Sequence, residues 1–500
     1  MPGFFVENFG CRATQADGAA LERQFEERGY SRASTPGQAS VVVLNTCTVT
    51  AGADQDARAS IRRVHRQNPQ ARIVVTGCYA QRAPEEIAAL PGVDMVVGNS
   101  HKHQLAEIAL SPSRAAGMAY GFVPLDALRI GRVTDASDGQ RPTTGDPRPI
   151  FVSDIFAHTE LIAAPVFDAA NERTRPNLKI QDGCDNRCSF CVIPFVRGQS
   201  RSMQPERIIS EVNTLVNAGY REVVISGINL GRWGRDFGGV SEISDVRGNR
   251  ERPTTNDQRL ESLIQSILCE TSLEKLRISS VEPMDWSDEL IALVASSPRI
   301  AKHAHVPMQS GSDAVLRRMH RKYRPWHYRE KIEKIRAAMP DAAIGADVMV
   351  GFPGETESEF AETRQMVEDL PFTYLHVFTY SPRPGTPAAE MRNQVPVHLA
   401  RERNRILRDL ASEKKLAFMR SFIGRTLEAI TLNVVGNDGA GEFTEALTDN
   451  YLRLRLRGRH EANRWLNVEV TDVVDGSLTG GLATITAEIL TLSCCAAGSE

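Results

Sequence analysis

The chain has 500 residues, of which 24% are charged and 41% hydrophobic, with a formal net charge of -3 and nine cysteines. This length predicts about three domains, and the near-neutral charge excludes a global basic field, so any nucleic-acid site must be a local patch. A secretory leader is not evident at the N-terminus, and no run of about 18 apolar residues occurs, so we expect a cytoplasmic protein whose cysteines serve metal or catalytic chemistry rather than disulfides.

Residues 1–110 alternate strand and helix patterns. Helical patterns cover residues 15–28 and 54–67 and begin again at Pro84. Each of three apolar runs between them is followed within a few residues by a cysteine: Cys11, Cys47 and Cys78. The alternation predicts an α/β fold with a Rossmann-like parallel sheet, whose ligands gather beyond the carboxyl ends of the strands. The three cysteines are therefore expected to converge and could ligate a cluster, although isolated buried cysteines explain the spacing equally well.

The pattern dissolves into Gly, Pro, Asp and Thr between residues 111 and 175, which we interpret as a linker. Six apolar runs, mostly separated by helical stretches, follow it and predict a partial (β/α)6 barrel. A polar stretch at residues 233–258 interrupts this unit and is interpreted as an insertion, with a lid as the alternative. The expected domains are residues 1–110, 176–420 and 424–490, the last an all-β unit.

The strongest chemical signal follows the first strand of the central unit, where Cys184, Cys188 and Cys191 have the spacing C-x3-C-x2-C. Three thiolates on one loop can hold three irons of a [4Fe-4S] cluster and leave the fourth open to a small molecule. A zinc site would prefer paired C-x2-C motifs, and chance clustering of buried thiols is the other alternative.

Polar and glycine-rich sequences stand at the other strand ends, where β/α barrels carry their function. The candidates for cofactor binding there are Gly227, Asn229, Ser279, Glu282 and Gln309. Turn-forming glycines and solvated loop residues are the alternative interpretations.

The C-terminal region contains a basic helical stretch, residues 398–425, and then a period-two pattern in residues 452–457. Leucines of this strand would line a core while Arg453, Arg455 and Arg457 face outward. Small barrels with charged strand faces bind single-stranded nucleic acid, but solubility alone explains the alternation equally well.

Nearly the whole chain resembles the methylthiotransferases of the radical S-adenosylmethionine (SAM) superfamily. The matching phrases are residues 45–50, 76–81, 181–184, 193–198, 279–283, 309–313 and 351–356. Residues 77–81, 279–283 and 381–386 most resemble the branch that modifies N6-threonylcarbamoyladenosine beside the tRNA anticodon. Residues 9–15 depart from the family's more frequent Leu-Gly-Cys-Lys-Val-Asn-Gln, with Cys11 and Gln15 retained.

The resemblance implies two [4Fe-4S] clusters and SAM as cofactors. The first cluster, on Cys184, Cys188 and Cys191, would bind SAM with Phe190 near the adenine; the second, on Cys11, Cys47 and Cys78, would carry sulfur. It further implies a central radical SAM barrel and a TRAM-like C-terminal barrel that grips tRNA.

The implied reaction is methylthiolation of carbon 2 of N6-threonylcarbamoyladenosine at position 37 of tRNA. It requires a sulfur donor and an electron donor of unknown identity, and we expect a monomer without membrane contact. A polar pocket for the threonylcarbamoyl group could involve Arg197 and Arg201, for which a structural role is equally consistent. Methylthiolation of prenyl-adenosine or of a ribosomal-protein side chain, and a non-catalytic iron–sulfur RNA-binding role, are the alternatives.

Overall fold

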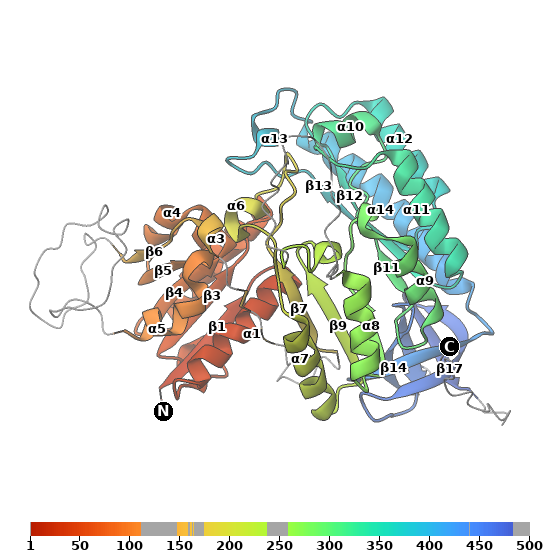
Figure 1. Ribbon diagram of the computed structural model, residues 1–500, viewed down its shortest axis with the longest axis horizontal. Helices are drawn as coiled ribbons and strands as arrows, with labels where there is room; N and C mark the ends of the chain where they lie inside the picture. Colours follow the sequence, from red (N-terminus) through yellow and green to blue (C-terminus); the bar gives the residue numbers. More distant parts are fainter. Residues whose placement is uncertain are drawn as a thin grey trace, which may run out of the picture.

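The computed structural model describes residues 2–111, 148–158, 161–162, 164, 175–237, 259–439 and 441–483. An N-terminal α/β unit, a central unit of parallel strands and helices, and a small C-terminal barrel follow one another along the chain (Figure 1). Within the described residues, none of the helices combines the length and apolar character needed to cross a membrane.

The N-terminal unit is a six-stranded sheet in the order β2-β1-β3-β4-β5-β6, and every neighbouring pair is parallel. Its strands are β1 (Gly3–Asn8), β2 (Ser31–Arg32), β3 (Val41–Thr46), β4 (Arg72–Gly77), β5 (Met95–Gly98) and β6 (Ile150–Phe151). Its helices are α1 (Arg12–Glu26), α2 (Ala51–Gln67), α3 (Cys78–Arg82), α4 (Pro84–Ala88) and α5 (Leu105–Leu110). Separate apolar clusters cover the two faces, so β3 is buried throughout, and the predicted parallel sheet is confirmed.

Strand β6 comes from the segment that we interpreted as a linker. It pairs with β5 at Val96 and Val97, so at least this part of residues 111–175 extends the N-terminal sheet. Two residues give too little periodicity for a strand to be recognised in the sequence. Residues 112–147 lie outside the described part of the chain.

The central unit contains six parallel strands in chain order. They are β7 (Asn177–Asp182), β9 (Glu222–Gly227), β10 (Lys275–Ile278), β11 (His303–His305), β12 (Ala343–Val350) and β13 (Tyr374–Thr379). The first three and the last three form continuous ladders, joined by single bridges from Leu276 to Ile300 and from Ser280 to His305. The short antiparallel β8 (Arg201–Ser202) lies beside β7.

Helices cover the outer side of these strands (Figure 1). They are α7 (Pro205–Asn217), α8 (Leu260–Glu270), α9 (Asp288–Ser296), α11 (Pro325–Ala338), α12 (Glu357–Asp369) and α14 (Val397–Arg420). Of the short helices, α6 (Ile193–Arg197) packs beside α3 of the N-terminal unit, and α10 (Asp313–Arg318) and α13 (Pro387–Glu390) lie at the top of the unit in Figure 1. The start of the expected insertion belongs to this core, because Trp233 is buried and its indole donates to the carbonyl of Met203 at 3.0 Å. The rest of the insertion, residues 238–258, lies outside the described residues.

The C-terminal unit is a closed barrel in the order β14-β15-β16-β18-β17. Its strands are β14 (Thr426–Asp438), β15 (Gly441–Thr448), β16 (Arg453–Arg457), β17 (Trp465–Val474) and β18 (Ser477–Leu482). Leu454 and Leu456 point into the barrel core, as the period-two pattern predicted. The turn between β15 and β16 docks onto the central unit, where Arg277 donates to the carbonyl of Asp449 at 3.1 Å.

Five buried charges join the N-terminal unit to the central unit. Asp17 of α1 pairs with Lys102 at 3.0 Å within its own unit, and with Arg197 at 3.0 Å and Lys179 across the junction. Asp182 completes the network through Lys179 at 2.8 Å and Arg197 at 2.9 Å. Burial raises the pKa of Asp17, but the three cations outweigh burial and lower it to about 2. Asp17 therefore binds cations of both units, and Lys179 and Arg197 each bind carboxylates of both units.

Replacement of Asp17 by Asn should destabilise the protein by about 3–5 kcal/mol, because three buried cations would share one remaining carboxylate. Denaturant unfolding followed by fluorescence and circular dichroism measures this loss. The folded pKa of Asp17, about 2, lies below the unfolded value of about 3.9, so its stabilisation is present above pH 4 and lost as the pH falls towards 2.

The control is Asp56→Asn, on the exposed face of α2, which should change the unfolding free energy by less than about 0.5 kcal/mol. Equal stability of the Asp17 and Asp56 variants at pH 7 would contradict the role assigned to the network.

Candidate active site

The cysteine loop of the central unit begins where β7 ends. Gly183 has a φ of 74°, and a side chain there would lie 1.8 Å from the carbonyl oxygen of Gln199, so only glycine fits before Cys184. The thiols of Cys184, Cys188 and Cys191 are close enough to influence one another: burial and then these neighbours raise the pKa of Cys191 to about 12. Three thiols on one loop are a donor set that iron binds as thiolates, so the loop fits one [4Fe-4S] cluster.

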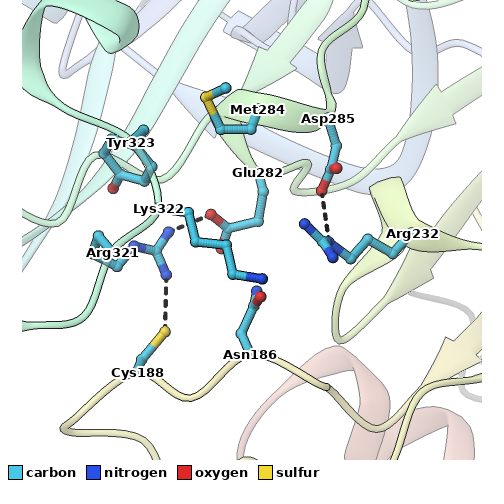
Figure 2. A pocket seen from close by; sticks show the side chains of 9 residues that line it. All are labelled: Asn186, Cys188, Arg232, Glu282, Met284, Asp285, Arg321, Lys322 and Tyr323. Atoms are coloured by element: carbon cyan, nitrogen blue, oxygen red, sulfur yellow. Dashed lines mark hydrogen bonds and ion pairs between the residues drawn. The ribbon is translucent and has the colours of Figure 1, made fainter. Parts of the chain in front are cut away.

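A pocket opens beside this loop (Figure 2). It is lined by Asn186, Cys188, Arg232, Glu282, Met284, Asp285, Arg321, Lys322 and Tyr323. Arg321 lies in its wall, 3.3 Å from Cys188 Sγ, and also pairs with Glu282. Burial raises the pKa of Glu282, although Arg321 opposes this. Arg321 therefore connects a cluster cysteine to a strand-end carboxylate.

The other strand-end candidates have mixed surroundings. Asn229 Nδ2 lies 3.7 Å from Cys184 Sγ, and Phe190 packs edge-on against Phe352 with ring centroids 6.3 Å apart. Gln309 is buried with a φ of 62°, and its side-chain oxygen has no hydrogen-bond partner among the described residues. A residue held in this conformation at a strand end is a typical functional position.

Gly227 and Ser279 have a structural explanation. A side chain at Gly227 would lie 2.9 Å from the side chain of Gln181, so this glycine makes room for a neighbouring residue. Ser279 donates its backbone N–H to Ile225 at 3.1 Å and thereby continues the ladder.

The second cysteine triad meets at the carboxyl edge of the N-terminal sheet. Cys11 precedes α1, Cys47 follows β3 and Cys78 begins α3, and burial together with the neighbouring Cys78 and Cys11 raises the pKa of Cys47 to about 12. Gly10 and Gly77 have φ values of 96° and 99°; a side chain at Gly10 would lie 2.8 Å from Cys47 Sγ. This convergence of soft donors also fits an iron–sulfur cluster.

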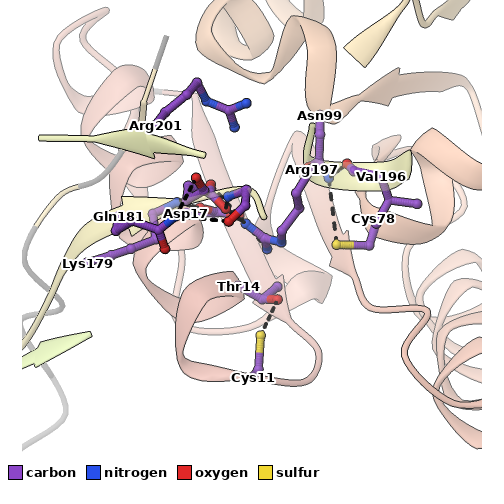
Figure 3. A network of polar contacts seen from close by, with 12 residues as sticks. Cys11, Thr14, Asp17, Cys78, Asn99, Lys179, Gln181, Val196, Arg197 and Arg201 are labelled. Carbon is purple, nitrogen blue, oxygen red and sulfur yellow. Dashed lines mark hydrogen bonds and ion pairs between the residues drawn. The ribbon is translucent and has the colours of Figure 1, made fainter. Parts of the chain in front are cut away.

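Arg197 lies at this second triad and, together with Arg201, also lines a pocket at the junction of the two units. Figure 3 shows it together with Asp17, Cys11 and Cys78, and its side chain is 2% exposed. Asn99 bridges the same junction, because its amide lies 3.6 Å from Cys78 Sγ and donates to the carbonyl of Val196 at 2.7 Å. Arg201 is also buried and donates to the carbonyl of Gln199 at 3.2 Å. Both arginines thus make structural contacts, and their role in binding the threonylcarbamoyl group stays a prediction.

Two features were not predicted from the sequence: Arg321, and the glycine that precedes one cysteine in each of three loops. Arg321 is separated from Glu282 by 39 positions and from Cys188 by 133, so no local pattern connects them. The glycine signal was present, because a Gly-Cys pair recurs at residues 10–11, 77–78 and 183–184. Each of these glycines has a positive φ.

The three C-terminal arginines lie on the outer face of β16. Arg455 is 3.3 Å from Asp475 and lies over the ring of Phe443, and Arg457 is 2.7 Å from Asp438. Arg453 is exposed, and no acidic partner lies within 4 Å among the described residues. The strand therefore carries a basic surface with an aromatic ring beside it.

Two family models match the chain: Uncharacterized protein family UPF0004 over residues 3–98 and the Radical SAM superfamily over residues 178–367. A radical S-adenosylmethionine methyltransferase from Kitasatospora setae, TsrM, has a similar fold, with a TM-score of 0.50 and 15% identity over 77% of this chain and 74% of its own.

Two curated relatives align over nearly the full length. Threonylcarbamoyladenosine tRNA methylthiotransferase MtaB of Bacillus subtilis is 35% identical over 90% of this chain and 90% of its own. The tRNA-2-methylthio-N(6)-dimethylallyladenosine synthase of Acidothermus cellulolyticus is 33% identical over 95% of this chain and 84% of its own. Because this identity extends across both cysteine triads and all three structural units, the chain belongs to the radical SAM methylthiotransferases, the family that includes the MtaB enzymes.

Proposed function

We propose that this protein methylthiolates carbon 2 of N6-threonylcarbamoyladenosine at position 37 of tRNA. The observation that carries the proposal is the 35% identity with the Bacillus subtilis enzyme, which covers nine-tenths of both chains and whose name states a threonylcarbamoyladenosine tRNA methylthiotransferase. The two cysteine triads on facing edges of neighbouring units support the same reaction class.

In this proposal the cysteines divide into two sets, each holding one [4Fe-4S] cluster. SAM and the clusters, when bound, supply the radical, sulfur and methyl-transfer chemistry. Arg321 orients Cys188, and Asn229 lies beside Cys184. The residues proposed to contact SAM are Phe190, Gly227, Asn229, Ser279, Glu282 and Gln309. The buried network around Asp17 joins the two units that carry the two sets and keeps these sets at a fixed separation.

The proposed domains are a methylthiotransferase unit at residues 1–110, a radical SAM barrel at 176–420 and a TRAM-like unit at 424–490. We propose that Arg453, Arg455 and Arg457 bind the tRNA backbone, because guanidinium groups beside an aromatic ring suit phosphates and stacked bases. A tRNA substrate implies a cytoplasmic enzyme. The monomeric state of the protein stays a prediction.

Prenyl-adenosine is the second candidate substrate. The similarity to the Acidothermus cellulolyticus enzyme, whose name states dimethylallyladenosine, is only slightly lower than that to the Bacillus subtilis enzyme. Neither curated relative described above is named for a protein substrate, so a ribosomal-protein side chain is the weaker alternative.

Anaerobically prepared protein should hold two [4Fe-4S] clusters, and joint replacement of Cys184, Cys188 and Cys191 by Ala should remove about half of the iron. Joint replacement of Cys11, Cys47 and Cys78 should remove the other half. The matched control is Cys269→Ala, an exposed thiol of α8, which should leave the iron content unchanged. Unchanged iron in either triple variant would contradict the assignment of that triad.

Replacement of Arg453, Arg455 and Arg457 by Ser should weaken tRNA binding and flatten its salt dependence, since each lost phosphate contact lowers the slope by about 0.9. Fluorescence anisotropy over a salt series measures both quantities. Arg364→Ser, on the exposed side of α12, serves as the control. An unaltered slope would show that the three arginines are only a solvated strand face.

Turnover on anticodon stem-loops should be at least about 100-fold faster with threonylcarbamoylated RNA than with prenylated or unmodified RNA, because polar groups of a dedicated pocket are left unpaired by an analogue lacking them. Mass spectrometry of the product nucleosides gives the rates. Equal turnover on the prenylated RNA, or turnover only on a ribosomal protein, would overturn this substrate assignment.

A further inference from the structure

The inner wall of the central barrel carries a polar face on β11, β12 and β13. Along β12, Ile344 and Val348 pack outward into the core beneath the helices, so Asp347 projects inward. Polar atoms of His305, Asp347 and His376, one from each strand, all lie within 4.8 Å of one another. Three adjacent polar residues on a wall that could have been apolar indicate a binding surface.

An aromatic layer lies next to this face. A side chain at Gly345 would be 1.9 Å from the Tyr374 ring. Because glycine has none, the Tyr374 ring can pack directly over the backbone of β12. The Tyr374 hydroxyl is 2.7 Å from Nε2 of His303, which fixes the orientation of the ring.

Residues from the two other units reach this layer. The ring of Tyr451, in the turn between β15 and β16, is 4.7 Å from that of His303 and 5.9 Å from that of Tyr374. Tyr451 has a φ of 69°, a backbone conformation that residues other than glycine rarely adopt. Its hydroxyl lies 3.5 Å from the Arg12 guanidinium. All three units therefore meet here.

The polar face is connected through neighbouring residues to both cysteine triads. Arg12 directly follows Cys11 in the sequence. At the other end, Met349 stands two residues after Asp347 on β12 and packs in the apolar cluster that Phe190 of the central cysteine loop also contacts. A base held against this face would therefore lie near chain segments that lead to both triads.

The polar groups of the face match a small substituent with a carboxylate and a hydroxyl better than an apolar one. Arg12 is exposed, and within the described ranges no carboxylate lies close enough to form an ion pair with it. Nε2 of His305 is buried, and the described residues supply no hydrogen bond to it, although Asp347 is 3.3 Å away. A cation, an imidazole and a carboxylate together can bind a carboxylate and a hydroxyl group, whereas an isoprenyl group would form no hydrogen bond with any of them.

We propose that Arg12, His305, Asp347 and His376 bind the amino-acid part of the modified adenosine, with Arg12 on its carboxylate and Asp347 accepting from its hydroxyl. This inference rests on the proposed function, because it names the residues that select the threonylcarbamoyl group. It makes Arg12 a specificity residue supplied by the N-terminal unit to a substrate held in the central barrel.

The test is binding of two anticodon stem-loops, identical except for threonylcarbamoylated or unmodified adenosine, to the anaerobic holoenzyme without reductant. The wild-type protein should prefer the threonylcarbamoylated RNA by about 10-fold or more, since a charge-assisted hydrogen bond is lost with the other. Arg12→Gln should lose most of this preference by weakening only the threonylcarbamoylated complex, and Arg12→Lys should retain part of it. Iron content, measured in parallel, should not change.

Arg23→Gln is the matched control, because Arg23 is an exposed arginine of the same helix that pairs with Glu27. It should leave both affinities unchanged. His376→Ala should reduce the preference as Arg12→Gln does.

The outcomes separate the two levels of the proposal. Equal wild-type affinity for the threonylcarbamoylated stem-loop and for a prenylated stem-loop measured alongside it would overturn the proposed function together with this inference. A preference that persists in both Arg12→Gln and His376→Ala, or an equal loss of affinity for both RNAs, would overturn the inference alone. One equivalent of a metal other than iron that is lost in His376→Ala would instead identify the His305, Asp347 and His376 group as a metal site.

Discussion

The buried charge network around Asp17 is the constraint on which the site depends. Asp17 and Lys102 belong to the N-terminal unit, and Lys179, Asp182 and Arg197 to the central unit. The central unit thus buries two cations with one carboxylate of its own and depends on Asp17 for a second. Separating or rotating the units would leave charges unpaired in a medium of low dielectric, which costs far more than most surface contacts contribute. The network therefore fixes the facing edges of the two units in one relative position.

Arg197 connects this constraint to both cysteine triads. It ends helix α6, which directly follows the loop of Cys191, and it pairs with Asp17 on the helix that begins after Cys11. A change in the position of one cysteine loop is thus transmitted through a short, rigid stretch to the other. For chemistry that requires two separate groups to reach one base, such rigidity places the reacting atoms before the substrate arrives.

Glycine performs a second, local task at the same edges. At Gly10, Gly77 and Gly183 the chain turns sharply out of a strand with positive φ, and the following cysteine is directed toward its neighbours. A side chain at Gly77 would lie 2.2 Å from the carbonyl oxygen of Thr46, immediately before Cys47. The close approach of the thiols thus depends on backbone that lacks a Cβ atom.

The sequence by itself determined the elements whose signal is local. The C-x3-C-x2-C spacing, the alternation of strands and helices and the leucine and arginine alternation of residues 452–457 each lie within one segment, and the corresponding loop, parallel sheet and half-buried strand are present. Only the tertiary structure decided which distant side chains meet. Arg197 and Asp17 are 180 positions apart, and Arg12 and Tyr451 are 439 apart. Periodicity reports which face of an element is buried, but the partner of a buried charge is set by how whole units pack, and no single segment encodes that.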